Sequence, residues 1–301
     1  MKDYAHIYTD EKLEEIEKEL IELYASASKE LDLQLIKIEK QIAKMTGENS
    51  TSEQRLRLLK EKNRIEKSLY YMSEKIQDCN ETAIKIFNKE SLNIYSENYN
   101  FGLFTMQKQS GIKFNFELFN DNLLKQFIDK NMGVFNYLAI DNVKDFGNIK
   151  REVERIFFVE LLKGSSIGEI ANALNKVLDK NMNKIITIVR TETTRIENAS
   201  RLDAFIYGEK LGLDLEKEWV ATIDGRTRKS HRGLNGQRVP IDEPFSNGLM
   251  YPGADGSADE VVGCRCTMTS DFKGFTKHKL EKELDEKLKE KAWQEWRGDI
   301  G

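Results

Sequence analysis

The first third of the chain is dominated by two amphipathic stripes. From Thr9 to Met45, apolar residues recur at spacings of three and four, with Glu and Lys filling the other positions. This spacing predicts one long helix with a single apolar face. The stripe consists of Leu13, Ile16, Leu20, Leu23, Ala27, Leu31, Leu35, Ile38, Ile42 and Met45.

A second stripe begins after the polar break TGENSTSEQ, where Thr51 and Gln54 form a predicted capping box. The simplest arrangement is an antiparallel helical hairpin over residues 1–95, roughly 50 Å long for about 35 residues per helix. The alternative is that both helices pack onto the domain that follows. The second stripe consists of Leu56, Leu59, Ile65, Leu69, Met72, Ile76, Ala83 and Phe87.

Residues 91–147 are rich in aromatic residues and Asn, and their periodicity is mixed. This predicts short helices and loops, which form an irregular connector over residues 96–147. A helix then runs from Asn148 to Gly164, and Ser166 with Glu169 predicts the capping box of the next helix. A longer third helix follows from residue 182 and stops at Gly212.

The pattern changes after that glycine. Residues 217–224 and 263–272 are predicted strands, separated by the glycine-rich turns of residues 225–257. The last segment, residues 273–301, is predicted to be a charged helix with an apolar residue at every fourth position and with Trp293 and Trp296 near its end. It either packs on one side or anchors a partner protein. The fold class is therefore α+β, predominantly α-helical.

Composition narrows the function classes. The 301 residues carry a formal net charge of -4, so any contact with DNA depends on a local basic patch. No run of eighteen apolar residues occurs, and the charged N-terminus lacks the apolar segment of a signal peptide, so we expect no membrane association. The three cysteines, Cys79, Cys264 and Cys266, do not form the even set of a disulfide framework.

Four motifs occur in order between residues 150 and 270: LLKGSSIGEIANAL, VRTETTRIENASRLDAF, EWVATIDGRTRKSHRGLNGQ and GCRCTM. Together they closely resemble the head morphogenesis domain of tailed-phage minor head proteins, the Mu F-like family. The resemblance implies a small β-containing head morphogenesis domain over residues 148–272. Its motif residues Arg190, Glu192, Trp219 and Asp224 are expected to form a structural core.

The resemblance also implies a function. Such proteins are components of the virion or procapsid that associate with the portal. They help DNA packaging and delivery, and some bind DNA. We therefore expect this chain to be a non-enzymatic assembly protein, present in the host cytoplasm during assembly, that contacts the portal protein or the major capsid protein. The rival functions are a metal-assisted nuclease or transferase-like effector built on the same domain, and a coiled-coil scaffold that uses residues 10–90.

The loop after the first predicted strand supports two interpretations. In one, Asp224 accepts backbone N–H bonds in a turn, while Arg226 or Arg228 pairs with Glu192 or Glu197 of the long helix. In the other, the loop is a phosphate-contacting patch. That patch would consist of Arg226, Arg228, Lys229, Arg232 and Arg238.

His231, Cys264 and Cys266 are candidate zinc ligands, because zinc prefers thiolates and neutral imidazole. Asp224, Asp255 and Asp259 are the candidates for a fourth ligand. The alternative is that the two thiols and the histidine form a buried, hydrogen-bonded contact. In the helix motif, Glu192 and Arg195 are three residues apart and close enough to pair.

Overall fold

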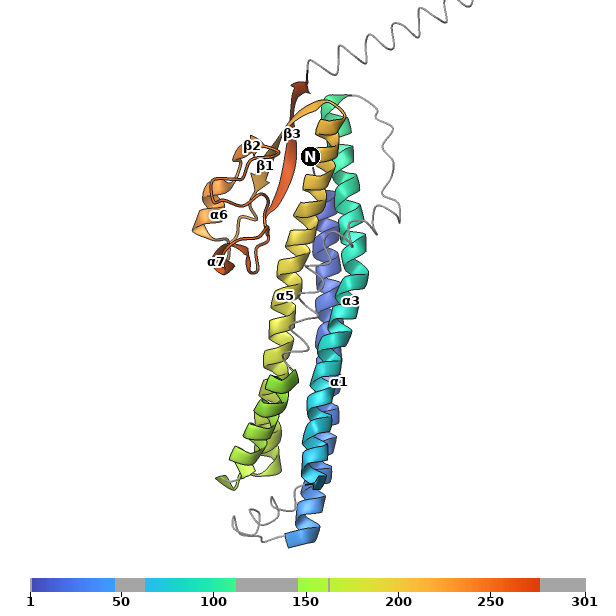
Figure 1. The fold of residues 1–301 in the computed structure, drawn as a ribbon, viewed down its shortest axis with the longest axis vertical. Coiled ribbons are helices and arrows are strands. Elements are labelled where there is room, and N and C mark those ends of the chain that lie inside the picture. The colour runs from blue at the N-terminus through green and yellow to red at the C-terminus, as the bar shows by residue number, and fades with distance from the viewer. Residues whose placement is uncertain (1, 47–62, 112–145, 162, 277–301) are drawn as a thin grey trace, which may run out of the picture. The chain divides into compact units, whose positions relative to one another are not determined.

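The computed structural model describes residues 2–46, 63–111, 146–161 and 163–276 (Figure 1). It divides into two compact units. The helical unit consists of Glu11–Ser91 and Lys125–Val189, and the sheet unit of Met1–Asp10, Leu92–Leu124 and Arg190–Gly301. Three long helices contribute residues to both units: α1 (Tyr4–Thr46), α3 (Asn63–Ser110) and α5 (Ile167–Lys210).

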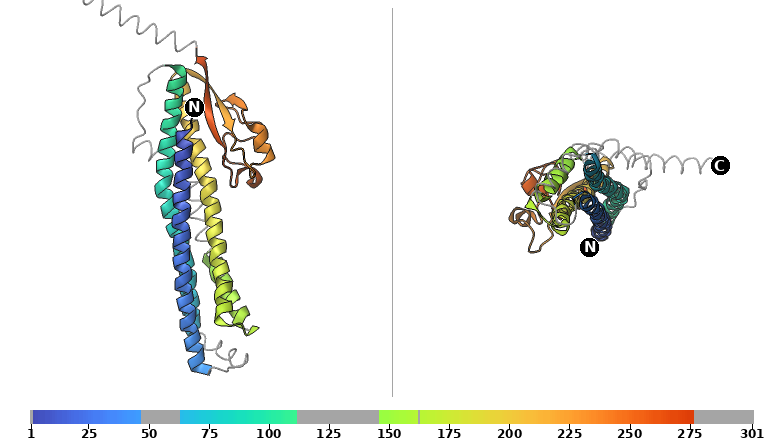
Figure 2. Two further views of the ribbon diagram at one scale, coloured as in Figure 1. Left: turned by 180° about the vertical axis from the view of Figure 1, so that it is seen from behind. Right: turned by 90° about the horizontal axis from the view of Figure 1, so that it is seen from below.

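In the helical unit, α1 and α3 lie side by side with opposite chain directions, as two opposed views show (Figures 1 and 2). The predicted antiparallel pair therefore exists, but it shares its core with residues 146–161 and with α5. The alternative that the pair packs onto the following segment also holds. The shared core consists of Tyr24, Ala27, Leu31, Leu35, Ile38, Leu69, Met72, Ile76, Cys79, Ile149, Val153, Phe157, Leu161, Ile170, Leu174, Val177 and Leu178.

Both predicted stripes point inward where the structure describes them. Ile16, Leu20 and Phe87 are at most 1% exposed, whereas the stripe members Leu13 and Leu23 are half-buried. The capping box predicted at residues 51–54 lies outside the described residues, as does the predicted C-terminal helix over residues 273–301 beyond residue 276. Among the described helices, none has the length and apolar character needed to cross a bilayer.

Two helix boundaries were predicted wrongly. Residues 91–110 are not short helices and loops but the end of α3, and α5 is one helix rather than two. The end of α3 buries Tyr95, Tyr99 and Met106 on one face, but Asn98 and Thr105 are buried among them. Because these buried polar residues interrupt the apolar stripe, the hydrophobic periodicity of residues 91–110 does not indicate a helix.

The start of α5 is as predicted. Gly164 has a φ of 79° and ends the preceding helix, where only glycine is unstrained. The Ser166 amide donates to Glu169 Oε2 at 2.7 Å, and the Glu169 amide donates to Ser166 Oγ at 3.3 Å. These reciprocal bonds are the predicted capping box.

The sheet unit contains a three-stranded antiparallel sheet in the order β2-β1-β3. Its strands are β1 (Leu213–Val220), β2 (Arg238–Pro240) and β3 (Thr267–Phe275). The first strand begins four residues before the predicted start, because Leu213 and Leu215 already alternate inward with Trp219. The closing strand begins at Thr267, after the two cysteines rather than before them.

Two short helices lie in the turns around this sheet, α6 (Lys229–Leu234) and α7 (Ala258–Val261). Their buried residues join one small core with the strand residue Trp219. That core consists of Trp219, Ala221, Leu234, Phe245, Leu249, Ala254, Val261, Cys264 and Cys266.

A buried arginine connects four segments of the sheet unit. Arg201 of α5 is 1% exposed, and its guanidinium forms a two-pronged ion pair with Asp3 at 2.6 and 2.8 Å. It also donates to Asn98 Oδ1 of α3 at 2.9 Å and to the Met268 carbonyl of β3 at 3.0 Å. A buried guanidinium without partners is costly, so these segments are held together by a shared charge.

His6 provides a pH-dependent contact in the same unit. Its Nδ1 lies 2.8 Å from Glu197 Oε1, and Asp10 and Arg201 are the other charges that act on it. Burial alone would lower the pKa of His6, but attraction to the Glu197 carboxylate outweighs it and raises the pKa to about 9.

We therefore expect the protein to lose stability as pH rises from about 6.5 to 9, because the folded state holds a proton that the unfolded chain releases earlier. Chemical denaturation across this range should show a loss of up to about 3 kcal/mol in the free energy of unfolding. A His6→Gln variant should lack this component. A variant with the same pH slope as the parent would contradict the assignment.

Candidate functional site

The two most specific motifs of the chain form one contact. Thr194 Oγ1 donates to the Cys264 carbonyl at 2.5 Å, and Asn198 Nδ2 donates to the Cys266 carbonyl at 3.1 Å. The Arg201 bond to the Met268 carbonyl continues the series. Positions 194, 198 and 201 lie on one face of α5, and they bind every second carbonyl of the extended chain.

This series is possible because the donors along α5 and the carbonyls along the extended chain have similar spacings. Seven residues of helix rise about 10 Å, and four residues of extended chain span up to about 13 Å. Each successive donor on α5 therefore lies near the next carbonyl that points toward the helix. We call this set of three bonds the α5 ladder; it fixes the position of the Cys-Arg-Cys segment against the helix.

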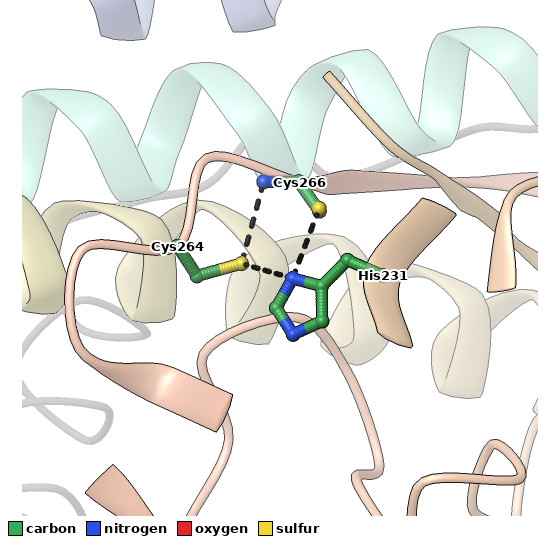
Figure 3. Close-up of side chains that lie close together, drawn as sticks. All are labelled: His231, Cys264 and Cys266. Atoms are coloured by element: carbon green, nitrogen blue, oxygen red, sulfur yellow. Dashed lines mark hydrogen bonds between the residues drawn. The ribbon is translucent and has the colours of Figure 1, made fainter. Parts of the chain in front are cut away.

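The two cysteine side chains of that segment face His231 (Figure 3). Cys264 Sγ lies 3.5 Å and Cys266 Sγ 3.4 Å from the same atom, His231 Nδ1. All three side chains are buried, and they are at most 3% exposed. Helix α6 carries His231, whose ring packs edge-on against Trp219 at 5.3 Å between centroids.

The cluster is electrostatically polarised. The contact between the two thiols lowers the pKa of Cys266 and raises the pKa of Cys264, and the facing imidazole also stabilises the Cys266 thiolate. The same contact raises the pKa of His231. Cys266 is thus the thiol that most readily gives up its proton.

Glu260 of α7 completes the surroundings of the histidine, and the sequence analysis missed it. Its Oε2 lies 3.0 Å from His231 Nε2 and accepts a bond from Asn247 Nδ2 at 3.3 Å. The sequence spacing of residues 231 and 260 does not predict this contact, because irregular turns between them bring the two side chains together.

None of the predicted fourth ligands reaches the cluster. Asp224 accepts from Arg265 Nη2 at 2.6 Å, and the side chain of Asp255 is 98% exposed beside Arg195. Asp259 is also exposed. Within the described part of the chain, only His231, Cys264 and Cys266 bring metal-binding atoms within 4.8 Å of one another.

Asp224 organises the loop after β1. Its Oδ1 accepts the Arg226 amide at 2.8 Å, as expected for a turn, and the Arg265 guanidinium lowers its pKa to about 2. The expected pairing of Arg226 or Arg228 with Glu192 or Glu197 is wrong. Arg226 Nε lies 3.9 Å from Asp224 Oδ2, and the Arg228 guanidinium donates to the Val262 carbonyl.

The five predicted DNA-contacting cations are in different situations. Arg238 is held between Glu218 at 2.7 Å and Asp271 at 2.8 Å, so its charge is already balanced. Arg228 is half-buried, whereas Arg226, Lys229 and Arg232 are exposed on the turn and on α6. The exposed three form the surface that a phosphate backbone could approach.

The predicted structural core of the motif is only partly buried. Trp219 is fully buried and Glu192 is half-buried, with Arg195 Nε at 3.8 Å from its carboxylate as the spacing suggested. Arg195 also donates to the Gly253 carbonyl at 3.0 Å, which attaches the turn to α5. Arg190 is exposed, so it does not belong to the core.

Comparison with known proteins agrees with this geometry. Residues 151–269 match the family described as Phage Mu protein F like protein, a segment that contains the α5 ladder and the His231 cluster. This segment therefore matches the Mu F-like head morphogenesis family that the motifs indicated.

Two curated relatives extend the comparison. Minor head protein GP7 of Bacillus phage SPP1 is 23% identical over 270 residues, which cover 87% of this chain and 83% of that protein. NAD(+)–arginine ADP-ribosyltransferase EFV of Enterococcus faecalis is 32% identical over 143 residues. That match covers 46% of this chain but only 29% of the transferase. No solved structure matches the chain significantly.

The close approach of the Gly253 turn to α5 can be tested. Gly253 has a φ of 83°, and a Cβ there would lie 3.0 Å from the Arg195 backbone nitrogen. Because the helix backbone cannot yield, Gly253→Ala should destabilise the protein by about 1–3 kcal/mol in denaturant unfolding. Gly236→Ala, where φ is also positive at 80° and a Cβ meets nothing within 4 Å, is the control and should destabilise the protein less. Equal effects would argue against the close contact.

Proposed function

We propose that this protein is a minor component of a tailed-phage head that joins the procapsid at the portal and assists DNA packaging or delivery. The observation that carries the proposal is the similarity to the SPP1 minor head protein, which extends over 270 residues. A match of that length involves both compact units, so it concerns the whole protein rather than one domain.

A non-enzymatic role fits the site better than the transferase-like alternative. The match to the transferase covers less than a third of that relative, so the activity in its name need not reside in the shared part. The cysteines and the histidine of this chain are buried, and a substrate would have to displace the core to reach them.

Association with the portal is tested directly by sedimentation. We expect the full chain to sediment with purified portal oligomers and with procapsids that contain the portal protein. Procapsids assembled without the portal protein are the control and should leave the chain in the supernatant. A chain that stays in the supernatant in all three mixtures would remove the portal from the proposal, and equal binding to both procapsids would replace it with the major capsid protein.

Contact with DNA is the second part of the proposal, and it concerns Arg226, Lys229 and Arg232. All three are exposed within seven residues of sequence, close to the N-terminus of α6. Each phosphate contact made by a cation releases counterions, so binding should weaken steeply with salt.

The triple variant Arg226→Ala, Lys229→Ala, Arg232→Ala should bind duplex DNA more weakly, and the slope of log K against log salt should fall by roughly 2–3. Fluorescence anisotropy with a labelled duplex at several salt concentrations measures both quantities. The control removes the same charge from the helical unit, at exposed Lys37, Lys40 and Lys89. If both triple variants behave alike, the loop is not a DNA contact.

A further inference from the structure

We propose that His231, Cys264 and Cys266 bind a zinc ion inside the sheet unit. The three side chains come from two segments more than thirty residues apart, α6 and the chain before β3, and they converge on one point (Figure 3). Two thiolates and one imidazole are the donors that zinc prefers. The ion would join these segments from within the core.

The two sulfur–nitrogen distances fit a tetrahedral ion. With Zn–S bonds of about 2.3 Å and a Zn–N bond of about 2.0–2.1 Å, tetrahedral angles place sulfur and nitrogen about 3.5–3.6 Å apart. The two sulfur atoms lie 3.5 and 3.4 Å from His231 Nδ1. The ion therefore needs only a small adjustment of side chains that already surround its position.

The hydrogen bond between His231 and Glu260 also supports a metal site. An ionised Glu260 can only accept, so the bond at 3.0 Å makes His231 Nε2 the donor, and in the neutral ring the Nδ1 lone pair then faces the two sulfurs. Metal-binding histidines usually donate their second ring N–H to a carboxylate or carbonyl, which fixes the tautomer and the ring orientation. Asn247 in turn holds the carboxylate.

The backbone of the cysteines is equally fixed. The α5 ladder binds the carbonyls of Cys264 and Cys266, and the Cys266 amide points at Cys264 Sγ at 3.4 Å. An N–H directed at sulfur stabilises a thiolate more than a neutral thiol. The site is thus built by residues outside the ligand set.

The described residues supply three ligands, and a water molecule would complete the tetrahedron. Because the three side chains are at most 3% exposed, the ion is enclosed and its role is structural rather than catalytic. It links α6 to the strand end, and its removal should loosen the turns between them.

The first measurement is the zinc content of the full chain purified under reducing conditions, followed by Co²⁺ addition to the metal-free protein. We expect about one zinc per chain, a thiolate-to-cobalt charge-transfer band, and a lower melting temperature after chelation. Cys264→Ser and Cys266→Ser should lose the band. Cys79→Ser, which removes the other buried cysteine, in α3, is the matched control and should keep it.

A Glu260→Gln variant is a second test that leaves all three ligands in place. It keeps the size of the side chain but weakens the bond to Nε2, and we expect roughly 10–100-fold weaker metal affinity. The proposal is overturned if the reduced parent protein contains no zinc and shows no charge-transfer band with Co²⁺. It is also overturned if the band survives in a Cys264→Ser, Cys266→Ser double variant. The parent measurement decides the question even if the serine variants fail to fold.

Discussion

Burial of polar side chains along one face of α5 is the constraint on which the sheet unit depends. Asn198, Glu197 and Arg201 are at most 2% exposed, and each would be costly to bury without a partner. Their partners are supplied by the N-terminal residues, by α3 and by the chain that leads into β3. The polar groups on this face of the helix are satisfied only when those distant segments are in place.

This constraint explains why two motifs seventy residues apart occur together. The helix motif supplies hydroxyl, amide and guanidinium donors, and the Cys-Arg-Cys segment supplies the carbonyls that receive them. The side chains of the same segment turn to the other side, where His231 and Trp219 lie. Alternation along an extended chain thus lets Cys264 and Cys266 bind the helix with their backbone carbonyls and place their sulfurs in the small core.

Sequence reasoning succeeded where one physical signal dominated. The apolar stripes of α1 and α3 and the Ser166–Glu169 capping box could be predicted because burial and capping leave regular spacings. The end of α3 could not, since its face mixes Tyr95 and Tyr99 with buried Asn98. The histidine and the two cysteines could be named from donor chemistry. Glu260 could not, because the irregular turns that bring it to His231 leave no periodic trace.

The α5 ladder also determines where the chain can change length. The donors on α5 bind every second carbonyl from Cys264 to Met268. One residue inserted between Cys264 and Met268 would therefore turn the carbonyls that follow it away from α5 and the side chains that follow it to the opposite side. One residue added between Thr194 and Arg201 would rotate the donors about 100° around the helix. Variation in length among relatives is therefore expected to be absent from the two ladder segments.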